Sequence, residues 1–416
     1  MQRESSKNLI ALCVGLTSVF IVQTMLLVAV PLYALDLGAS PLIVGLALSA
    51  PYILPLIFAI PLGGLVTRGG GRRVVIVGGI GLTVGPLFVV MLPGYTGLLL
   101  SQFCFGISQL IMILGAQSII SGLARGVTLE KYFGWYTTCL SGGQLVGPLL
   151  AGWLIDSIEV RAAFIAMGAI AVLGFASGLC SASTILSGHP NCRRTGLFLK
   201  GKAIEGAVVE KSLLGYRAQA RLLKTNPGVQ VSIVLTVAVM FALGAHSSFL
   251  PVYLESSSFS AMVIGALISL RALSAMAVRP FMSKIIRRVG GRVYAMIISI
   301  GLAGAGVIFT GFTVSVGMLA FFSVLAGVGS GISQPLSVVV LAEHVSLGQR
   351  PSALGMRLMG NRGVQFFAPL LLGLLTEVLP FSLTFLIAGL VVFTFLFLTV
   401  CLIPAYERKL KEDCTQ

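Results

Sequence analysis

The chain has 416 residues, of which 56% are hydrophobic and only 10% are charged. This composition excludes a soluble protein, because the buried fraction of a soluble domain rises too slowly with size to hide so much apolar side chain. The net charge of +15 would suit a nucleic-acid ligand. Most Lys and Arg residues, however, lie in segments predicted to be cytoplasmic, where the positive-inside rule accounts for them. We therefore expect a membrane protein with no nucleic-acid partner.

Windows of about 20 apolar residues predict twelve helical membrane spans. In chain order they are 9–34, 41–66, 74–94, 96–123, 133–155, 161–183, 227–252, 261–283, 293–313, 315–340, 352–376 and 381–404. We expect an all-α multi-pass protein of the plasma (inner) membrane with both termini in the cytoplasm. Its parts are a six-helix bundle at 1–183, a cytoplasmic linker at 184–226 and a second six-helix bundle at 227–416.

The second half repeats residues of the first half at a nearly constant spacing of about 220 residues. The repeated residues include Pro31, Tyr33, Gly45, Ser49, Arg68 and Arg72, which return as Pro251, Tyr253, Gly265, Ser269, Arg288 and Arg292. Many secondary transporters consist of two such repeats around a site at the membrane midplane. The repeat therefore predicts two pseudo-symmetric bundles and favours transport.

The linker at 184–226 is rich in basic residues. Arg217, Arg221 and Lys224 recur there at helical spacing beside leucines, which is typical of an amphipathic helix on the inner leaflet. A solvated linker would show the same charge. Membrane lipids are expected partners in either case.

The first motif lies between the second and third spans, where residues 63–73 read Gly-Gly-Leu-Val-Thr-Arg-Gly-Gly-Gly-Arg-Arg. This segment resembles the Gly-x-Leu-Ala-Asp-Arg-x-Gly-Arg-Arg loop of the major facilitator superfamily, and a partial copy follows the eighth span. The resemblance implies that both copies close the cytoplasmic side. The candidate gate residues are Gly63, Thr67, Arg68, Arg72, Arg73, Arg287, Arg288 and Arg292. Thr67 replaces the usual Asp and lacks its charge at a helix start, which predicts a weaker latch. The alternative is that these arginines only set topology.

The fifth span carries a second resemblance, to the antiporter motif of the same superfamily. The matching residues are Gly134, Gly143, Gly147, Pro148 and Gly152. Small residues allow close helix packing and proline kinks a helix, so we expect a sliding seam, echoed in the eleventh span. The resemblance implies an exporter of drugs or metabolites, whereas ordinary helix packing is the alternative interpretation.

The membrane spans contain few charged residues. None of the thirteen acidic residues lies within the core of a predicted span, which disfavours the simplest proton antiport. His246 is the one intramembrane group with an ordinary pKa near neutrality, so protons remain a candidate coupling ion. Gln102 stands where many members of the superfamily have the Arg that is linked to proton coupling.

Four arginines lie within predicted spans. Arg279 and Arg357 are close enough to the inner surface to snorkel towards it. Arg271 and Arg362 lie deeper, where a guanidinium costs several kcal/mol unless it contacts water, a partner or an anion. They predict a positive region in the substrate cavity. The candidate cavity residues are Gln23, Gln109, Gln117, His246, Arg271, Gln334, Asn361, Arg362 and Gln365. For the amides, ordinary hydrogen bonds between helices are the alternative role.

Taken with these residues, the resemblance covers the whole chain and implies a secondary transporter that exports a small amphiphilic molecule by rocking its two halves. That molecule is expected to be anionic if Arg271 and Arg362 contact it. An importer or facilitator for an organic anion is one alternative, and a non-transporting sensor or lipid-handling protein is another. No nucleotide-binding motif, metal-ligand spacing or nucleophile–base pair is evident, so we expect a protein that is not an enzyme and has no metal or cofactor. The resemblance to the superfamily implies a monomer.

Overall fold

The computed structural model describes residues 2–69, 71–123, 127–187, 221–345 and 350–415, and several side chains at helix ends lie outside the described part. The first half contains α1 (Gln2–Asp36), α2 (Pro41–Gly69), α3 (Gly71–Met91), α4 (Tyr95–Leu123), α5 (Val127–Ser157) and α6 (Val160–Ser187). The second half contains α8 (Pro227–Ser256), α9 (Ala261–Val278), η3 (Arg279–Phe281), α10 (Met282–Arg288), α11 (Arg292–Thr310), α12 (Val316–Glu343), α13 (Arg350–Val378) and α14 (Phe381–Thr415). The described residues contain no strand.

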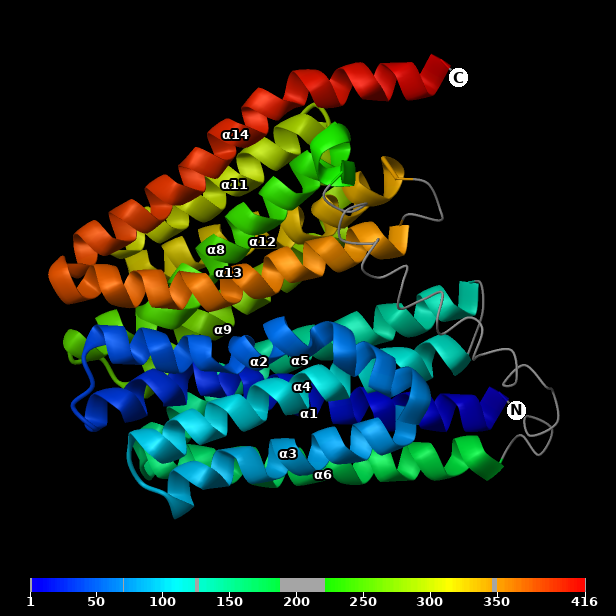
Figure 1. Ribbon diagram of the computed structural model, residues 1–416. Coiled ribbons are helices and arrows are strands. Elements are labelled where there is room, and N and C mark those ends of the chain that lie inside the picture. The colour runs from blue at the N-terminus through cyan, green and yellow to red at the C-terminus, as the bar shows by residue number, and fades with distance from the viewer. Residues whose placement is uncertain (1, 70, 124–126, 188–220, 346–349, 416) are drawn as a thin grey trace.

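The helices form two bundles that lie side by side (Figure 1). In the first bundle α1 packs against α5 and α6, and α3 packs against α4 and α6. In the second, α8 packs against α12, α13 and α14. Both chain termini lie at one end of the molecule, which we call the terminal end, and the α1–α2 connection lies at the opposite end, which we call the loop end.

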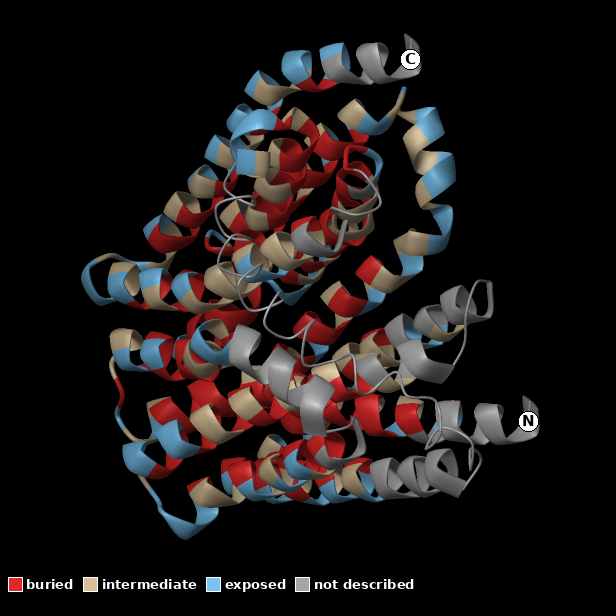
Figure 2. Ribbon diagram, turned by 45° about the vertical axis from the view of Figure 1, so that its right-hand side comes forward, coloured by how far each residue is buried: buried red, intermediate tan, exposed pale blue. Residues whose placement is uncertain are grey.

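The helices have the length and surface that a bilayer requires. Eleven of them are long and apolar enough to span a membrane, and α6 supplies a shorter apolar segment at Val160–Ala176. Buried residues line the interior of each bundle, and exposed ones cover its outside (Figure 2). Many exposed residues are large and apolar, including Trp153 and Phe397, which a lipid-facing surface accommodates. The predicted twelve-helix membrane fold is confirmed.

Two helix boundaries differ from the prediction for physical reasons. The span predicted at 261–283 is broken after Val278 by the 3₁₀ turn at Arg279–Phe281, because Pro280 has no N–H to continue the α-helical ladder. The span predicted to end at 404 continues to Thr415, since polar residues also support a helix once it has left the bilayer.

Candidate functional site

The two halves meet along α2 with α13 and along α5 with α9. The Ser49 hydroxyl donates to the carbonyl of Phe366, and the Ser269 hydroxyl donates to the carbonyl of Leu145, both at 2.7 Å. These bonds follow the internal repeat. Each accepting carbonyl lies one residue after a carbonyl that a proline, Pro369 or Pro148, deprives of its helical partner. The kinked helices can therefore accept a bond from the other half.

Glycines bring the same helices into very close contact. A β-carbon on Gly265 would collide with the carbonyl of Pro148, and one on Gly45 would collide with the carbonyl of Pro369. Gly152 lies in the same way against the backbone of α9 at Ala261. Only glycine leaves space for backbones this close, so this contact between the halves depends on residue size.

The glycines of the fifth-span motif do not all face the other half. A β-carbon on Gly143 would lie 2.6 Å from that of Phe20 on α1, and one on Gly147 would meet the hydroxyl of Thr24 and the carbonyl of Ile21. The motif therefore has two faces, and the face with Gly143 and Gly147 packs inside its own bundle. The surroundings of Gly134 lie outside the described side chains.

Where α1 and α2 face α13, three of the candidate cavity residues lie in one group. Arg362 donates to the Gln365 side chain at 3.2 Å, and its guanidinium lies 5.9 Å from the centre of the Tyr52 ring. Tyr52 is in turn hydrogen-bonded to Gln23. The group joins α1 and α2 of the first half to α13 of the second. Sequence reasoning missed Tyr52, for which the available signal was a phenol within an apolar span.

Arg271 and His246 form a second group, within the second half. The His246 ring is 0% exposed, and its Nε2 lies 3.2 Å from the Ser323 hydroxyl. His246 Nδ1 and Arg271 Nε are both buried and have no hydrogen-bond partner among the described residues. The positive charge of Arg271 interacts electrostatically with the His246 ring. A half-buried guanidinium with a buried unpaired nitrogen, interacting with a buried imidazole that has an unpaired nitrogen of its own, is a place where an anionic or hydrogen-bonding ligand would be stabilised.

The remaining candidate amides are more scattered. Asn361 Oδ1 on α13 and Gln109 Nε2 on α4 are buried without a partner in the described part of the chain. Gln102 Nε2 lies two turns before Gln109 and is also unpaired there. Gln117 on α4 is engaged within the protein. The unpaired atoms keep α4 and α13 among the candidate ligand-binding helices, because buried polar groups normally have partners.

Arg279 and Arg357 are both hydrogen-bonded to groups inside the protein. Arg279 donates to the Ser141 hydroxyl of the other half at 2.8 Å and to the Gln334 side chain at 3.4 Å. Arg357 donates to Ser337 at 2.9 and 3.1 Å and to the Gln334 carbonyl at 3.2 Å. Gln334, a candidate cavity residue, is therefore bonded to both arginines.

We expect Arg357→Ala to lower the free energy of unfolding by about 1–3 kcal/mol, since it removes charge-assisted hydrogen bonds between α13 and α12. Ser337 also donates to the Gln334 carbonyl at 2.8 Å, which limits the loss. The thermal unfolding midpoint in detergent measures the effect. Arg408→Ala, at an exposed arginine, is the control. Equal midpoints for the two variants would contradict the prediction.

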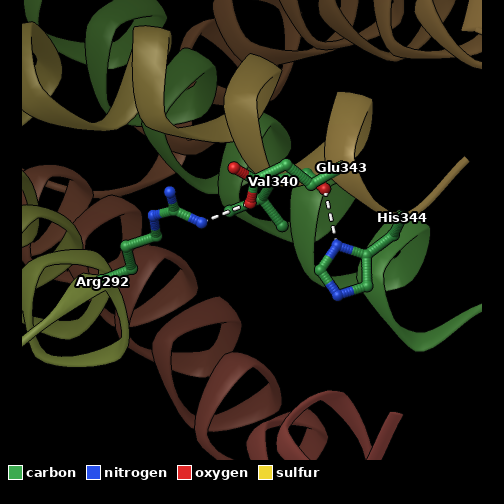
Figure 3. Close-up of polar contacts among 4 residues, drawn as sticks. All are labelled: Arg292, Val340, Glu343 and His344. Carbon is green, nitrogen blue, oxygen red and sulfur yellow. Dashed lines mark hydrogen bonds and ion pairs between the residues drawn. The ribbon is translucent and has the colours of Figure 1, made fainter. Parts of the chain in front are cut away.

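At the terminal end, one predicted gate residue is bonded within its own half. Arg292 on α11 forms an ion pair with Glu343 at the end of α12 (Figure 3). The next residue, His344, has its Nδ1 2.9 Å from the Val340 carbonyl, and its own carbonyl accepts from the Asn226 side chain at 2.6 Å. The Arg292 contact thus ties α11 to α12 and not to the first half.

The other predicted gate residues provide less structural information. Arg287 and Arg288 at the end of α10 are exposed. The side chains of the first copy of the motif lie outside the described part of the chain; these residues are Gly63, Thr67, Arg68, Arg72 and Arg73.

Comparison with known proteins agrees with this architecture. The family model of the Major Facilitator Superfamily matches residues 12–293 and 232–413. The quinolone resistance protein NorA of Staphylococcus aureus (strain Mu50 / ATCC 700699) is 23% identical over 250 residues, which are 60% of this chain and 58% of NorA. The multidrug transporter protein MdtP of Bacillus subtilis (strain 168) is 28% identical over 155 residues, 36% of this chain and 28% of MdtP. The chain therefore spans less than two thirds of the length of these relatives.

Solved structures share the fold over nearly the full length. A bacterial homologue of the human lysosomal transporter Spinster, in an inward-facing and unoccupied conformation, superposes with a TM-score of 0.76 at 16% identity and covers 99% of both chains. A POT family transporter in complex with 5-aminolevulinic acid gives a TM-score of 0.76 at 15% identity, with 96% of both chains covered. At these identities the likeness concerns the fold.

Proposed function

Because this chain belongs to the major facilitator superfamily, we propose that it exports a small amphiphilic molecule by rocking its two halves about a site between them. The printed names of NorA and MdtP concern quinolone resistance and multidrug transport, and they support this direction. The antiporter-type motif of α5 supports it as well. In this proposal residues 1–183 and 227–416 are the moving halves, residues 184–226 link them, and the chain acts as a monomer.

The proposed orientation places both termini in the cytoplasm of the cell. The distribution of Lys and Arg supports it. Within the described residues, the hydrogen bonds between the halves lie towards the loop end, and Arg279 to Ser141 is the one nearest the terminal end. With this orientation the loop end, where the halves are bonded to each other, faces the outside and is closed in this structure.

The substrate in this proposal carries an acidic group as well as an apolar body. The observation that carries this is Arg271 Nε, buried without a hydrogen-bond partner in the described part of the chain. The Arg271 charge also interacts with His246, whose Nδ1 is buried and unpaired in the same part. Arg362 and the Tyr52 ring supply a second cation and an aromatic surface. His246 is the candidate for a group that exchanges a proton during antiport.

Two other functions compete with this one. The arginines equally suit an organic-anion importer or facilitator, driven by the substrate gradient alone. A sensor or lipid-handling protein would not need glycine-lined contacts that allow the halves to move. The direction of transport and its coupling to a proton gradient therefore distinguish these alternatives.

Proteoliposomes with an imposed pH gradient test the proposal. We expect wild-type protein to move amphiphilic organic anions, and Arg271→Ala and Arg362→Ala to slow this by about tenfold or more, since a hydrogen bond to a charged group contributes about 1.5–3 kcal/mol. Arg408→Ala is the matched control. His246→Ala should uncouple the anion flux from the pH gradient. Cationic dye efflux that is driven by the gradient and unaffected by loss of either arginine would overturn the anionic substrate, and absence of any flux would overturn transport.

A further inference from the structure

At the loop end, each half supplies a carboxylate to the first turn of a helix in the other half. Asp156, at the end of α5, accepts hydrogen bonds from the backbone N–H groups of Ala261 and Met262 on α9, both at 2.8 Å. Glu377, at the end of α13, accepts from the backbone N–H of Leu42 on α2 at 3.1 Å. Each carboxylate thus caps a helix of the opposite half.

The two caps follow the internal repeat, since Asp156 and Glu377 are separated by nearly the same spacing as Leu42 and Met262. The first N–H groups of a helix have no partner within the helix, and negative charge is stabilising there. A carboxylate from the other half satisfies both requirements. Here the bonds also cross the boundary along which the halves are proposed to move.

These bonds can exist only while the loop end is closed. They lie at the outer limit of the interface in which Gly45 and Gly265 contact the opposite backbone. Separation of the halves at this end would remove the carboxylates from the N–H groups. The negative charge on Asp156 and Glu377 therefore stabilises the closed arrangement over the open one.

We propose that Asp156 and Glu377 form an outer latch, and that protons arriving from outside neutralise these carboxylates and shift the transporter towards the outward-open state. The inference rests on the proposed orientation and on the rocking of the halves. Both side chains are exposed, so external protons reach them directly. By linkage, a charged form that is bonded only in the closed state makes protons bind preferentially to the open state.

Other charged groups at this end act on the same equilibrium. Asp36 at the end of α1 and Asp156 both repel Glu255 at the end of α8. Protonation of Asp36 or Glu255 relieves this repulsion and so favours closure, with a sign opposite to that of the latch. Protonation of Asp156 relieves part of the same repulsion, which offsets part of the effect of losing its hydrogen bonds. Glu159 lies between α5 and α6, and Arg161 lies in the first turn of α6; both are exposed.

The helices packed on α5 and α13 add no further charge here. By sequence, α2, α4, α9, α12 and α14 carry no charged residue in the first two turns at their loop ends. The latch has direct hydrogen bonds, whereas the repulsion acts through exposed groups that solvent screens. The net expected effect of acid is therefore opening.

Distances between pairs of spin labels, measured by electron–electron double resonance, test the latch without any substrate. Labels at Leu92→Cys and Val314→Cys, exposed positions at the loop ends of the two halves, report opening in nanodiscs after the native cysteines are replaced. We expect the open-to-closed ratio of Asp156→Asn/Glu377→Gln to exceed that of wild type by roughly threefold for each carboxylate. Asp156→Ala/Glu377→Ala should give a larger increase, because the amides keep an acceptor oxygen.

Acidification from about pH 7.5 to about pH 4.5, across the ordinary range of carboxylates, should open wild type. It should not open Asp156→Asn/Glu377→Gln, in which only the closing effect of Asp36 and Glu255 remains. Glu159→Gln, which removes an exposed acid outside the latch, should behave like wild type. Unchanged distances in both double variants, or acid opening that persists in them, would overturn the latch.

The single variants Asp156→Asn and Glu377→Gln test the latch in the same way if a double variant does not fold. An intermediate shift in each supports the latch, and no shift in either overturns it. Because no substrate is present, failure here is distinguishable from failure of the proposed anion export.

Discussion

Valine in place of Gly265 is expected to reduce transport at least about tenfold while both halves remain folded. Its β-carbon would meet the carbonyl of Pro148 on α5, and backbone cannot move aside as a flexible side chain can. Overpacking of this kind costs about 1–3 kcal/mol. This cost destabilises the state in which the loop end is closed, and it does not affect the folding of either bundle alone. Transport in proteoliposomes, together with the unfolding midpoint, measures the two effects separately.

The control for this prediction is Gly301→Val on α11, where an added β-carbon meets nothing within 4 Å. Gly45→Val, the repeat-related substitution, should behave like Gly265→Val because Gly45 meets the carbonyl of Pro369. Normal transport by Gly265→Val would show that the halves do not need this close contact.

Valine in place of Gly147 should have the opposite pattern and destabilise the fold itself, by about 1–3 kcal/mol, the usual cost of overpacking. Gly147 packs against Thr24 and Ile21 of α1 within the first bundle, so the clash is present in every state of the transport cycle. The expected result is a lower unfolding midpoint and a lower yield of folded protein in detergent.

Gly142→Val is the matched control, because it lies on the same helix and its added β-carbon meets nothing within 4 Å. If Gly147→Val keeps the midpoint of Gly142→Val but loses transport, the face of the motif towards α1 moves during the cycle and the assignment of two separate faces is wrong.

Together these substitutions address what the fifth-span motif does. The sequence pattern treats Gly143, Gly147 and Gly152 as one seam. In the fold, the first two lie against α1 and the last lies against α9. Residues five positions apart on a helix point in different directions, so one motif serves both a fixed contact and a contact between the halves.

The arginines show the same division between sequence and structure. Depth within a span predicted that Arg271 needs a partner, and its buried Nε lacks one among the described residues. It did not reveal the partners of Arg279 and Arg357, because Ser141 is far from Arg279 in sequence and Ser337 lies on a different helix from Arg357. From the sequence alone, a serine within an apolar span does not reveal which arginine it contacts.

The membrane environment, the twelve helices and the twofold repeat could all be predicted from the amino-acid sequence. Apolar composition and a repeated spacing can be recognised without knowing which residues are in contact. The same holds for the expectation that prolines and glycines would shape α5 and α13. Helix packing was needed to establish which half each glycine faces, that Tyr52 joins Arg362, and that Asp156 and Glu377 cap helices across the interface. Each of these contacts joins residues that are distant along the chain, and no local pattern specifies such pairings.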